Sequence, residues 1–199
     1  MLTLNAQFIK LIMQTNEKDI KDIKKFFNSY SKGFSSIYTE DDQSRSMFNK
    51  LIDKWFRKAV YRRYEITLSE TQKDSINSVL DVGCGPGHHT IAFLHQGKEV
   101  TALDVADEMV DLTKEKVAKF NSNASCKYIV SDYMTHSFDE QFDAICVMGF
   151  FDYVSDPVTV LKKLLSEARK EIYISIPNEK GLLGLQRRIR YWLKNCPLY

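Results

Sequence analysis

The chain has 199 residues, of which 44% are hydrophobic and 27% charged, with only 8 glycines and 4 prolines. This composition is that of an ordinary globular protein and excludes collagen-like, low-complexity and disordered chains. The length suits one α/β domain with additional elements. No apolar run approaches the roughly 18 residues of a membrane-spanning helix, and the first ten residues lack the features of a secretory signal, so we expect a cytoplasmic protein.

The formal net charge of +2 is unevenly distributed. Residues 1–78, 79–184 and 185–199 carry net charges of +4, −6 and +4. Affinity for nucleic acid depends on phosphate neutralisation by Lys and Arg, so the acidic central segment argues against a nucleic-acid partner. The four cysteines lie far apart, without CxxC or Cys/His pairs at metal spacing, and we expect reduced thiols and no metal site.

Two amphipathic segments precede the core of the chain. Apolar residues three and four positions apart predict helices over Asp19–Tyr30 and Met47–Val60. The polar residues 31–46 between them predict a mobile loop that would serve as a lid. We therefore divide the chain into an N-terminal helical cap, residues 1–75, and a core, residues 76–199.

From residue 76 to residue 177, short apolar runs alternate with amphipathic ones, as in successive βα units. The predicted strands are Ser78–Val82, Glu99–Asp104, Cys126–Ser131, Phe142–Met148 and Glu171–Ile176, and the predicted helices are about 87–95, Ala106–Phe120 and Pro157–Arg169. Crossover connections are right-handed and helices cover both faces of a parallel sheet. The pattern thus predicts an α/β fold: a Rossmann-like, doubly wound, mostly parallel sheet with an N-terminal helical cap.

The most informative stretch is VLDVGCGPGHHT, residues 79–90, which joins a buried strand, three alternate glycines and the start of a helix. In open α/β sheets ligands bind beyond the carboxyl ends of the strands, and glycines let the backbone approach the ligand. Asp104 ends the second strand 21 positions after Gly83, a distance typical of a carboxylate that binds ribose hydroxyls. Asp132 follows the third strand at the same edge. The alternative is a tight turn that only packs strand against helix.

A nicotinamide dinucleotide would bind at the same edge, but its fingerprint is G-x-G-x-x-G, and His88 stands in the last glycine position. The spacing DxGxGxG over residues 81–87 instead resembles motif I of the class I S-adenosylmethionine-dependent methyltransferases. The run GFFDYVSDP, residues 149–157, is similar to one that many bacterial members carry after the fourth strand. The resemblance covers about residues 76–177.

The resemblance implies S-adenosylmethionine as cofactor and S-adenosylhomocysteine as product. It places the ribose on Asp104, the adenine amine on Asp132, and the cap over the cleft. The cofactor-binding residues that it implies are Tyr30, Tyr38, Asp81, Gly83, Cys84, Gly85, Gly87, Asp104, Val105, Met109, Asp132, Tyr133, Met148 and Gly149. Such a cofactor has no phosphates and needs acceptors for hydroxyl, amine and ammonium donors. A core role for Met109 and a small turn residue at Cys84 are the alternatives.

The catalytic residue stays unknown, and the candidates are His88, Asp152 and Tyr153. Their alternatives are a helix-start role for His88 and loop hydrogen bonding for the other two. Residues 149–152 lack the Asn/Asp-Pro-Pro-Tyr/Phe run of many amino methyltransferases of nucleic-acid bases, and the Pro-Cys nucleophile of cytosine enzymes is missing. By elimination we expect a small-molecule, sugar or lipid-linked acceptor.

The leading hypothesis is methyl transfer to a small-molecule or glycan-linked acceptor. The alternatives are a non-catalytic, cofactor-binding partner subunit and, less favoured, nicotinamide-dependent oxidoreduction. The basic tail carries Arg187, Arg188, Arg190 and Lys194, which either contact an anionic acceptor or a membrane surface or lie on a solvated helix. We also expect the final edge hairpin of the family to be absent, which would open the fifth strand to pairing with a second copy.

Overall fold

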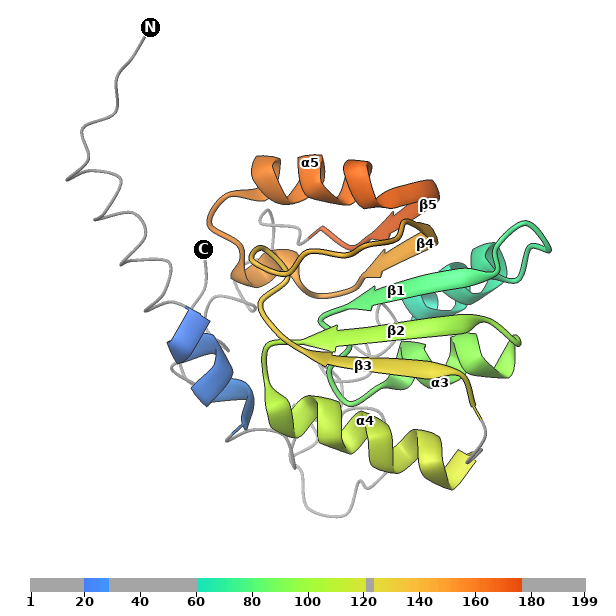
Figure 1. Ribbon diagram of the computed structural model, residues 1–199, viewed down its shortest axis with the longest axis horizontal. Coiled ribbons are helices and arrows are strands. Elements are labelled where there is room, and N and C mark those ends of the chain that lie inside the picture. The colour runs from blue at the N-terminus through green and yellow to red at the C-terminus, as the bar shows by residue number, and fades with distance from the viewer. Residues whose placement is uncertain (1–19, 29–60, 121–123, 177–199) are drawn as a thin grey trace, which may run out of the picture.

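The computed structural model describes residues 20–28, 61–120 and 124–176. Five strands form one sheet in the order β3-β2-β1-β4-β5 (Figure 1). They are β1 (Ser78–Val82), β2 (Glu99–Asp104), β3 (Cys126–Val130), β4 (Phe142–Val147) and β5 (Ala168–Ile174). All the pairings between them are parallel, so their carboxyl ends meet at one edge. The predicted α/β, Rossmann-like architecture is confirmed.

Helices cover both faces of this sheet. On one face lie α3 (His88–His95) and α4 (Asp107–Phe120), which contact each other and the strands β1, β2 and β3. Residues 61–71 form a further helix on this face, where Leu68 packs against the core. On the other face α5 (Pro157–Glu167) packs against β5 (Figure 1). This arrangement leaves the carboxyl edge of the sheet as the place where loops from both faces meet.

Local sequence explains where these helices begin. The N-cap of α5 is Asp156, whose carboxylate accepts a hydrogen bond from the Thr159 backbone N–H at 3.1 Å, and Pro157 follows as the first helical residue. The first turn of α4 carries Asp107 and Glu108, which suit the positive end of its dipole. In contrast, α3 begins after a glycine and has no acidic residue in its first turn.

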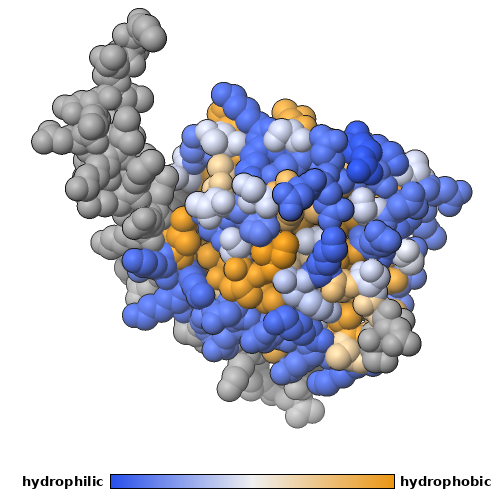
Figure 2. Space-filling model, in the orientation of Figure 1, coloured by the Kyte–Doolittle hydropathy of each residue, from blue (hydrophilic) through white to orange (hydrophobic). Residues whose placement is uncertain are grey.

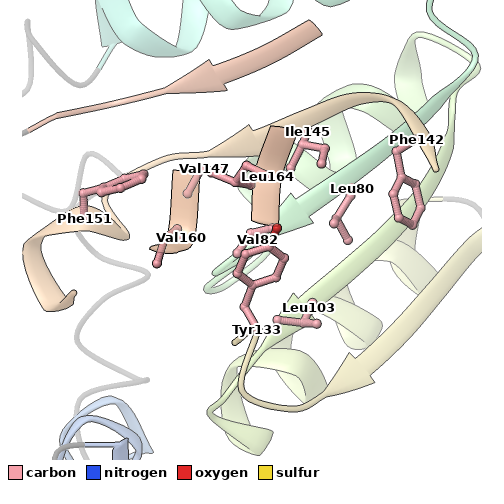
Figure 3. Close-up of a cluster of buried hydrophobic side chains, with 10 residues drawn as sticks. All are labelled: Leu80, Val82, Leu103, Tyr133, Phe142, Ile145, Val147, Phe151, Val160 and Leu164. Carbon is pink, nitrogen blue, oxygen red and sulfur yellow. The ribbon is translucent and has the colours of Figure 1, made fainter. Parts of the chain in front are cut away.

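Apolar side chains fill the space on both faces of the central strands. Figure 3 shows the cluster on the α5 face, formed by Leu80, Val82, Leu103, Tyr133, Phe142, Ile145, Val147, Phe151, Val160 and Leu164. The cluster on the α3 face consists of Ile76, Val79, Phe93, Val100, Ala144 and Cys146. Every residue of β4 is buried, as expected for a central strand covered on both faces.

The connection between β3 and β4, residues 131–141, contains no helix. Two of its side chains, Tyr133 and Phe138, pack in the apolar cluster on the α5 face, and the ring of His136 contacts Phe138 at 4.6 Å between ring centroids. Figure 2 shows an apolar area in the middle of this view, where the ribbon of Figure 1 has strands with no helix in front of them. Side chains of this loop thus cover the sheet where, between other strands, a crossover helix covers it.

At the opposite, amino edge of the sheet, Asp143 joins three strands. Its carboxylate accepts hydrogen bonds from the Asn77 N–H at 2.9 Å and from Arg169 Nη1 at 3.0 Å, and pairs with Lys170 Nζ at 2.9 Å. These contacts explain why β5 begins at Ala168 and not at the predicted residue 171: charged residues that looked like a helix end belong to the strand. The helix α5 correspondingly ends at Glu167.

The helix over residues 61–71 was not predicted from the sequence. Its inward side carries the buried Thr67 and Thr71, whose hydroxyls donate to the carbonyl oxygens four residues earlier at 2.9 Å. Because these buried positions are polar, the sequence lacks the apolar periodicity that would have predicted this helix. Residues 20–28 are helical, inside the predicted range 19–30.

Several predicted features lie outside the described residues: Tyr30, Tyr38, the helix over 47–60, and the basic residues Arg187, Arg188, Arg190 and Lys194. Within the described ranges, none of the helices is long and apolar enough to cross a membrane.

Candidate active site

The glycine turn after β1 is held against the end of β2. The backbone N–H groups of Gly83 and Cys84 both donate to the Leu103 carbonyl, at 2.8 and 3.0 Å. The N–H of Gly85 donates to Asp104 Oδ2 at 2.9 Å. The Thr113 hydroxyl of α4 donates to the Gly85 carbonyl, also at 2.9 Å. The turn therefore has a fixed shape that does not depend on a ligand.

The glycines of this turn have different functions. A Cβ on Gly87 would lie 2.6 Å from Thr113 Cγ2, so this glycine allows α3 and α4 to pack closely. A Cβ on Gly83 would meet Phe150 Cδ2 at 3.2 Å, whereas a Cβ on Gly85 or on Gly149 would meet nothing within 4 Å. Open space thus lies over Gly85 and Gly149, which follow the neighbouring strands β1 and β4.

The Asp104 carboxylate at the end of β2 borders this turn. Its Oδ1 accepts from the Ala106 N–H at 2.9 Å and its Oδ2 from Gly85, while burial raises the pKa of the carboxyl despite these hydrogen bonds. Each carboxylate oxygen has a second lone pair. Asp104 can therefore accept hydroxyl groups from a ligand without giving up its backbone partners.

The carboxylate of Asp132, after β3, is only half satisfied. Its Oδ1 accepts from the Met134 N–H at 3.0 Å, whereas Oδ2 is buried and has no hydrogen-bond partner. A buried acceptor without a partner is costly, and native structures rarely leave one without a functional reason. A ligand amine that donates to Oδ2 would satisfy it.

Asp81, inside β1, supports the turn from below. Its Oδ2 accepts from the Thr90 hydroxyl at 2.7 Å, which ties the start of α3 to the strand. Burial, assisted by the negative charge of Asp104, raises the pKa of Asp81 to about 7. Asp81 is almost inaccessible, so it shapes the turn and its electric field.

The N-terminal helix 20–28 crosses the carboxyl edge of the sheet (Figure 1). Near its end, Asn28 Nδ2 donates to Asp107 Oδ1 at 2.8 Å, and Lys24 Nζ lies 3.2 Å from the same oxygen. Phe27 meets the ring of Tyr153 at 5.2 Å between centroids. The helix thereby joins the residue that begins α4, after β2, to the 3₁₀ helix η2 (Phe151–Tyr153), after β4.

The sequence itself is similar to known methyltransferases. Residues 79–170 match the sequence profile of a family described as a methyltransferase domain. Over 124 residues the chain is 27% identical to a probable cobalt-precorrin-6B C(15)-methyltransferase (decarboxylating) from Thermoplasma acidophilum, covering 61% of each chain. These matches support a class I S-adenosylmethionine-dependent methyltransferase, as the DxGxGxG turn implied. Over 95 residues it is also 35% identical to a ubiquinone biosynthesis O-methyltransferase from Xanthomonas campestris, covering 44% of this chain but only 37% of that relative.

Solved structures share the methyltransferase fold. A magnesium protoporphyrin IX methyltransferase from Synechocystis PCC 6803 with bound SAM aligns at a TM-score of 0.63 with 18% identity, covering 76% of this chain and 72% of that one. The cyclase SpnF aligns at 0.58, also with 18% identity, covering 73% of this chain and 55% of that one. These likenesses show the fold alone. Since one of the two proteins is named a cyclase, the methyltransferase fold does not by itself fix the reaction.

Two residues that the family resemblance assigned to the cofactor turn into the core. The Tyr133 side chain is 1% exposed and its hydroxyl donates to Glu167 Oε2 at 2.6 Å; Figure 3 shows it among Val82, Leu103 and Leu164. Met109 is likewise 1% exposed, in agreement with the core alternative. The backbone of Tyr133 remains beside Asp132, while Val105 is half-buried at the edge.

The other assigned residues lie around the turn or at the end of β4. Burial raises the pKa of the Cys84 thiol well above its usual range, so Cys84 is a small, protonated turn residue beside Thr113. Met148 Sδ lies 4.0 Å from the Thr67 hydroxyl oxygen, so the end of β4 meets helix 61–71. The Gly149 N–H donates to the Ser175 hydroxyl at 2.7 Å.

The two histidines that open α3 turn to different sides. Burial and the charge of Lys116, on α4, lower the pKa of His88 to about 4. Burial and the charge of Arg63 lower the pKa of His89 to about 4, and its ring meets Tyr64 at 5.2 Å between centroids. Both rings are neutral at pH 7. The sequence made His88 a catalytic candidate. The ring that faces helix 61–71 is that of His89, and this helix was not predicted.

The remaining catalytic candidates lie in η2. Asp152 and Tyr153 follow β4, and Tyr153 contacts helix 20–28 through Phe27. In the described part of the chain, no group of three or more His, Cys, Asp or Glu side chains is arranged to hold a metal ion.

Proposed function

We propose that this protein transfers a methyl group from S-adenosylmethionine to a small-molecule or glycan- or lipid-linked acceptor. The similarity of residues 79–170 to a methyltransferase domain supports the reaction. The chain spans 61% of the Thermoplasma relative and 37% of the Xanthomonas one, so the activity of those whole proteins is taken here as a guide to chemistry.

One observation carries the proposal: the open space over Gly85 and Gly149 is bordered by two carboxylates that suit an adenosine. Asp104 retains acceptor capacity for ribose hydroxyls, and Asp132 Oδ2 lacks the donor that an adenine amine would supply. These strand ends present carboxylates, which suit the hydroxyl and amine donors of a cofactor without phosphates. The residues present therefore fit S-adenosylmethionine.

When bound, S-adenosylmethionine supplies a methyl group activated by a sulfonium. For an in-line displacement the protein chiefly has to orient the reactants and exclude water. The backbone of the glycine turn and Gly149 provides a close-fitting floor, while helix 20–28 covers the edge through its contacts with Asp107 and Tyr153. Asp152 and Tyr153, beside that helix, are the groups we expect to contact the acceptor.

The names of related proteins support a small-molecule acceptor. They include enzymes named for cobalt-precorrin, ubiquinone biosynthesis and magnesium protoporphyrin IX, whose acceptors are small molecules and not nucleic acid or protein. The acidic central segment agrees with this choice, because nucleic acid would be repelled from it.

The decisive experiment measures binding and turnover separately. Titration calorimetry should show saturable binding of S-adenosylmethionine and S-adenosylhomocysteine, and none of NADH. Incubation with a methyl-labelled cofactor and a small-molecule extract should then transfer the label to a product identified by mass spectrometry. Failure to bind either nucleoside would refute the proposal. Cofactor binding without transfer to any class of acceptor would favour the non-catalytic partner subunit instead.

A further inference from the structure

An ion pair near the end of α5 faces the connection between β3 and β4. Lys163 Nζ lies 2.7 Å from Glu167 Oε1, and the two side chains are only 19% and 12% exposed. In each of the other ion pairs described, one side chain is at least 39% exposed. Enclosing a pair costs desolvation that further hydrogen bonds have to offset. We therefore ask which groups the remaining valences of this pair bind.

Both charges of the pair bind residues of the connection. The Tyr133 hydroxyl donates to Glu167 Oε2 at 2.6 Å, and Lys163 Nζ donates to the His136 carbonyl at 2.7 Å. The ammonium also lies 5.1 Å from the centre of the Tyr133 ring, within the range of a cation–π contact. Burial and the hydrogen bond to Glu167 raise the pKa of Tyr133 above its usual range, so its hydroxyl stays a donor. Two residues of α5 thus hold both ends of the segment 133–136.

The same segment forms the turn that orients Asp132. The backbone carbonyl of Asp132 accepts from the N–H groups of Thr135 and His136, at 3.2 and 3.0 Å. Its Oδ1 accepts from the Met134 N–H at 3.0 Å. The other oxygen, Oδ2, is buried and has no hydrogen-bond partner among the described residues. Because the backbone and one oxygen of Asp132 are fixed on this turn, the direction of Oδ2 depends on where the turn is held.

The connection itself contains little that could hold the turn in place. Residues 131–141 include no helix, whereas α3, α4 and α5 form the connections between the other neighbouring strands in the chain. A helix keeps its shape through its own backbone hydrogen bonds, and a connection without one depends on its neighbours. The contacts of Tyr133 and His136 with α5 supply this external support.

Building on the proposed function, we propose that Lys163 and Glu167 are positioning residues that hold Asp132 Oδ2 where an adenine amine reaches it. They act through Tyr133 and the turn 133–136. A carboxylate held in one orientation accepts from the amine of adenine and repels a carbonyl oxygen at the same place, whereas a loosely held one discriminates less. The enclosed ion pair therefore contributes to selection of the base as well as to stability.

The test compares S-adenosylhomocysteine with S-inosylhomocysteine, in which a carbonyl oxygen replaces the adenine amine. Titration calorimetry gives the ratio of the two affinities for each protein. Tyr133→Phe keeps the buried ring and removes the hydroxyl, and Lys163→Met keeps an unbranched side chain and removes the ammonium. We expect each variant to lower the preference for S-adenosylhomocysteine about three- to tenfold, a part of the factor that a hydrogen bond to a charged group contributes. Urea unfolding checks that the variants are folded.

Two further comparisons separate positioning from a general loss of stability. Asp132→Asn should abolish the preference by itself, so adding Tyr133→Phe to this variant should not change the ratio further. Lys127→Met is the matched control, because it removes an ion pair of equal length, 2.7 Å, with Glu140 of the same connection. That pair is exposed, and we expect the ratio of the parent to be retained.

The outcomes lead to distinct conclusions. Reduced preference in Tyr133→Phe and Lys163→Met, with the parent's ratio in Lys127→Met, supports the positioning role. A parent-like ratio in either folded variant, or an equal fall when Asp132 is already replaced, would overturn that role and leave the proposed function standing. A parent protein that binds both ligands equally would do the same. A parent protein that binds neither ligand would overturn the proposed function as well.

Discussion

The groups on the two sides of the glycine turn differ in charge. On the side of β2 and β3, the carboxylates of Asp104 and Asp132 stand at the strand ends, and one buried oxygen lacks a donor. On the side of α3 and helix 61–71, a neutral His89 lies near Arg63. The contrast teaches that this edge suits a ligand with hydroxyl and amine donors at one end and an acceptor at the other.

The largest effect is expected at the boundary between the two sides. Gly87→Ala would bring a methyl carbon to 2.6 Å from Thr113 Cγ2 and place a non-glycine residue at a φ of +77°. Left-handed backbone and overpacking together cost about 2–5 kcal/mol of the free energy of unfolding. Gly85→Ala meets nothing within 4 Å and pays only the backbone cost. Urea unfolding of both variants checks this difference, and equal losses would contradict the packing role of Gly87.

Asp81→Asn should change how the free energy of unfolding depends on pH. In the folded protein the pKa of Asp81 is about 7, above its ordinary value of 3.8. Between these pH values the native carboxyl keeps a proton that the unfolded chain has lost, so its contribution to the free energy of unfolding falls as pH rises. The variant should gain on the parent by up to about 1.4 kcal/mol per pH unit in this window and level off above it.

The measurement for Asp81 is urea unfolding of parent and variant without ligand between pH 5 and pH 8. The difference between the two proteins is the quantity of interest, because His88 and His89 act in the opposite direction. Their pKa values are lowered to about 4, so their contributions to stability grow as pH rises from 4 toward 6.5 in both proteins. A stability difference that does not vary with pH would disprove the raised pKa of Asp81.

Asp104→Asn should weaken binding of S-adenosylhomocysteine by about 1.5–3 kcal/mol, the range for a hydrogen bond that involves a charged group. Because Asp104 is assigned to the ribose, 5′-methylthioadenosine, which keeps the adenosine but lacks the amino-acid end, should lose the same amount. Calorimetry with both ligands provides the comparison, and unchanged affinities in a folded variant would show that the ribose lies elsewhere.

The smallest effect is expected for helix 20–28, which contacts both Asp107 and Tyr153. Asp107→Asn removes the ion pair with Lys24, an exposed contact of the kind that contributes little to stability. We expect cofactor affinity to fall by a few-fold at most and amide exchange in residues 20–28 to speed up. Asp111→Asn removes the exposed pair with Lys114 on the same helix α4 and should leave that exchange unchanged. Identical exchange in both variants would refute the covering role of helix 20–28.

Local signals in the sequence were sufficient to predict the sheet and its acidic edge. Strand, turn and helix around residues 81–87 follow one another within the chain, and the strand ends at Asp104 and Asp132 follow from alternating apolar runs. Parallel strands bring their carboxyl ends together, so the proximity of these groups needs no further information.

The rest depended on contacts between segments far apart in the sequence. Whether Tyr133 faces the cleft or the core is decided by the β3–β4 connection, whose side chains cover the sheet in place of a helix. Which neighbours His88 and His89 meet is decided by the packing of α4 on one side and of helix 61–71 on the other. The buried threonines of helix 61–71 hid that element, and its contact with His89 was hidden with it.

The Asp143 network at the amino edge has a consequence for how this protein tolerates sequence change. By joining the start of β1, β4 and β5 through Asn77, Arg169 and Lys170, it fastens the sheet at the end farthest from the glycine turn. Loops at the carboxyl edge can then accumulate substitutions without weakening this anchor. Substitutions in these loops, natural or engineered, can therefore change the specificity for the methyl acceptor while the sheet keeps its stability.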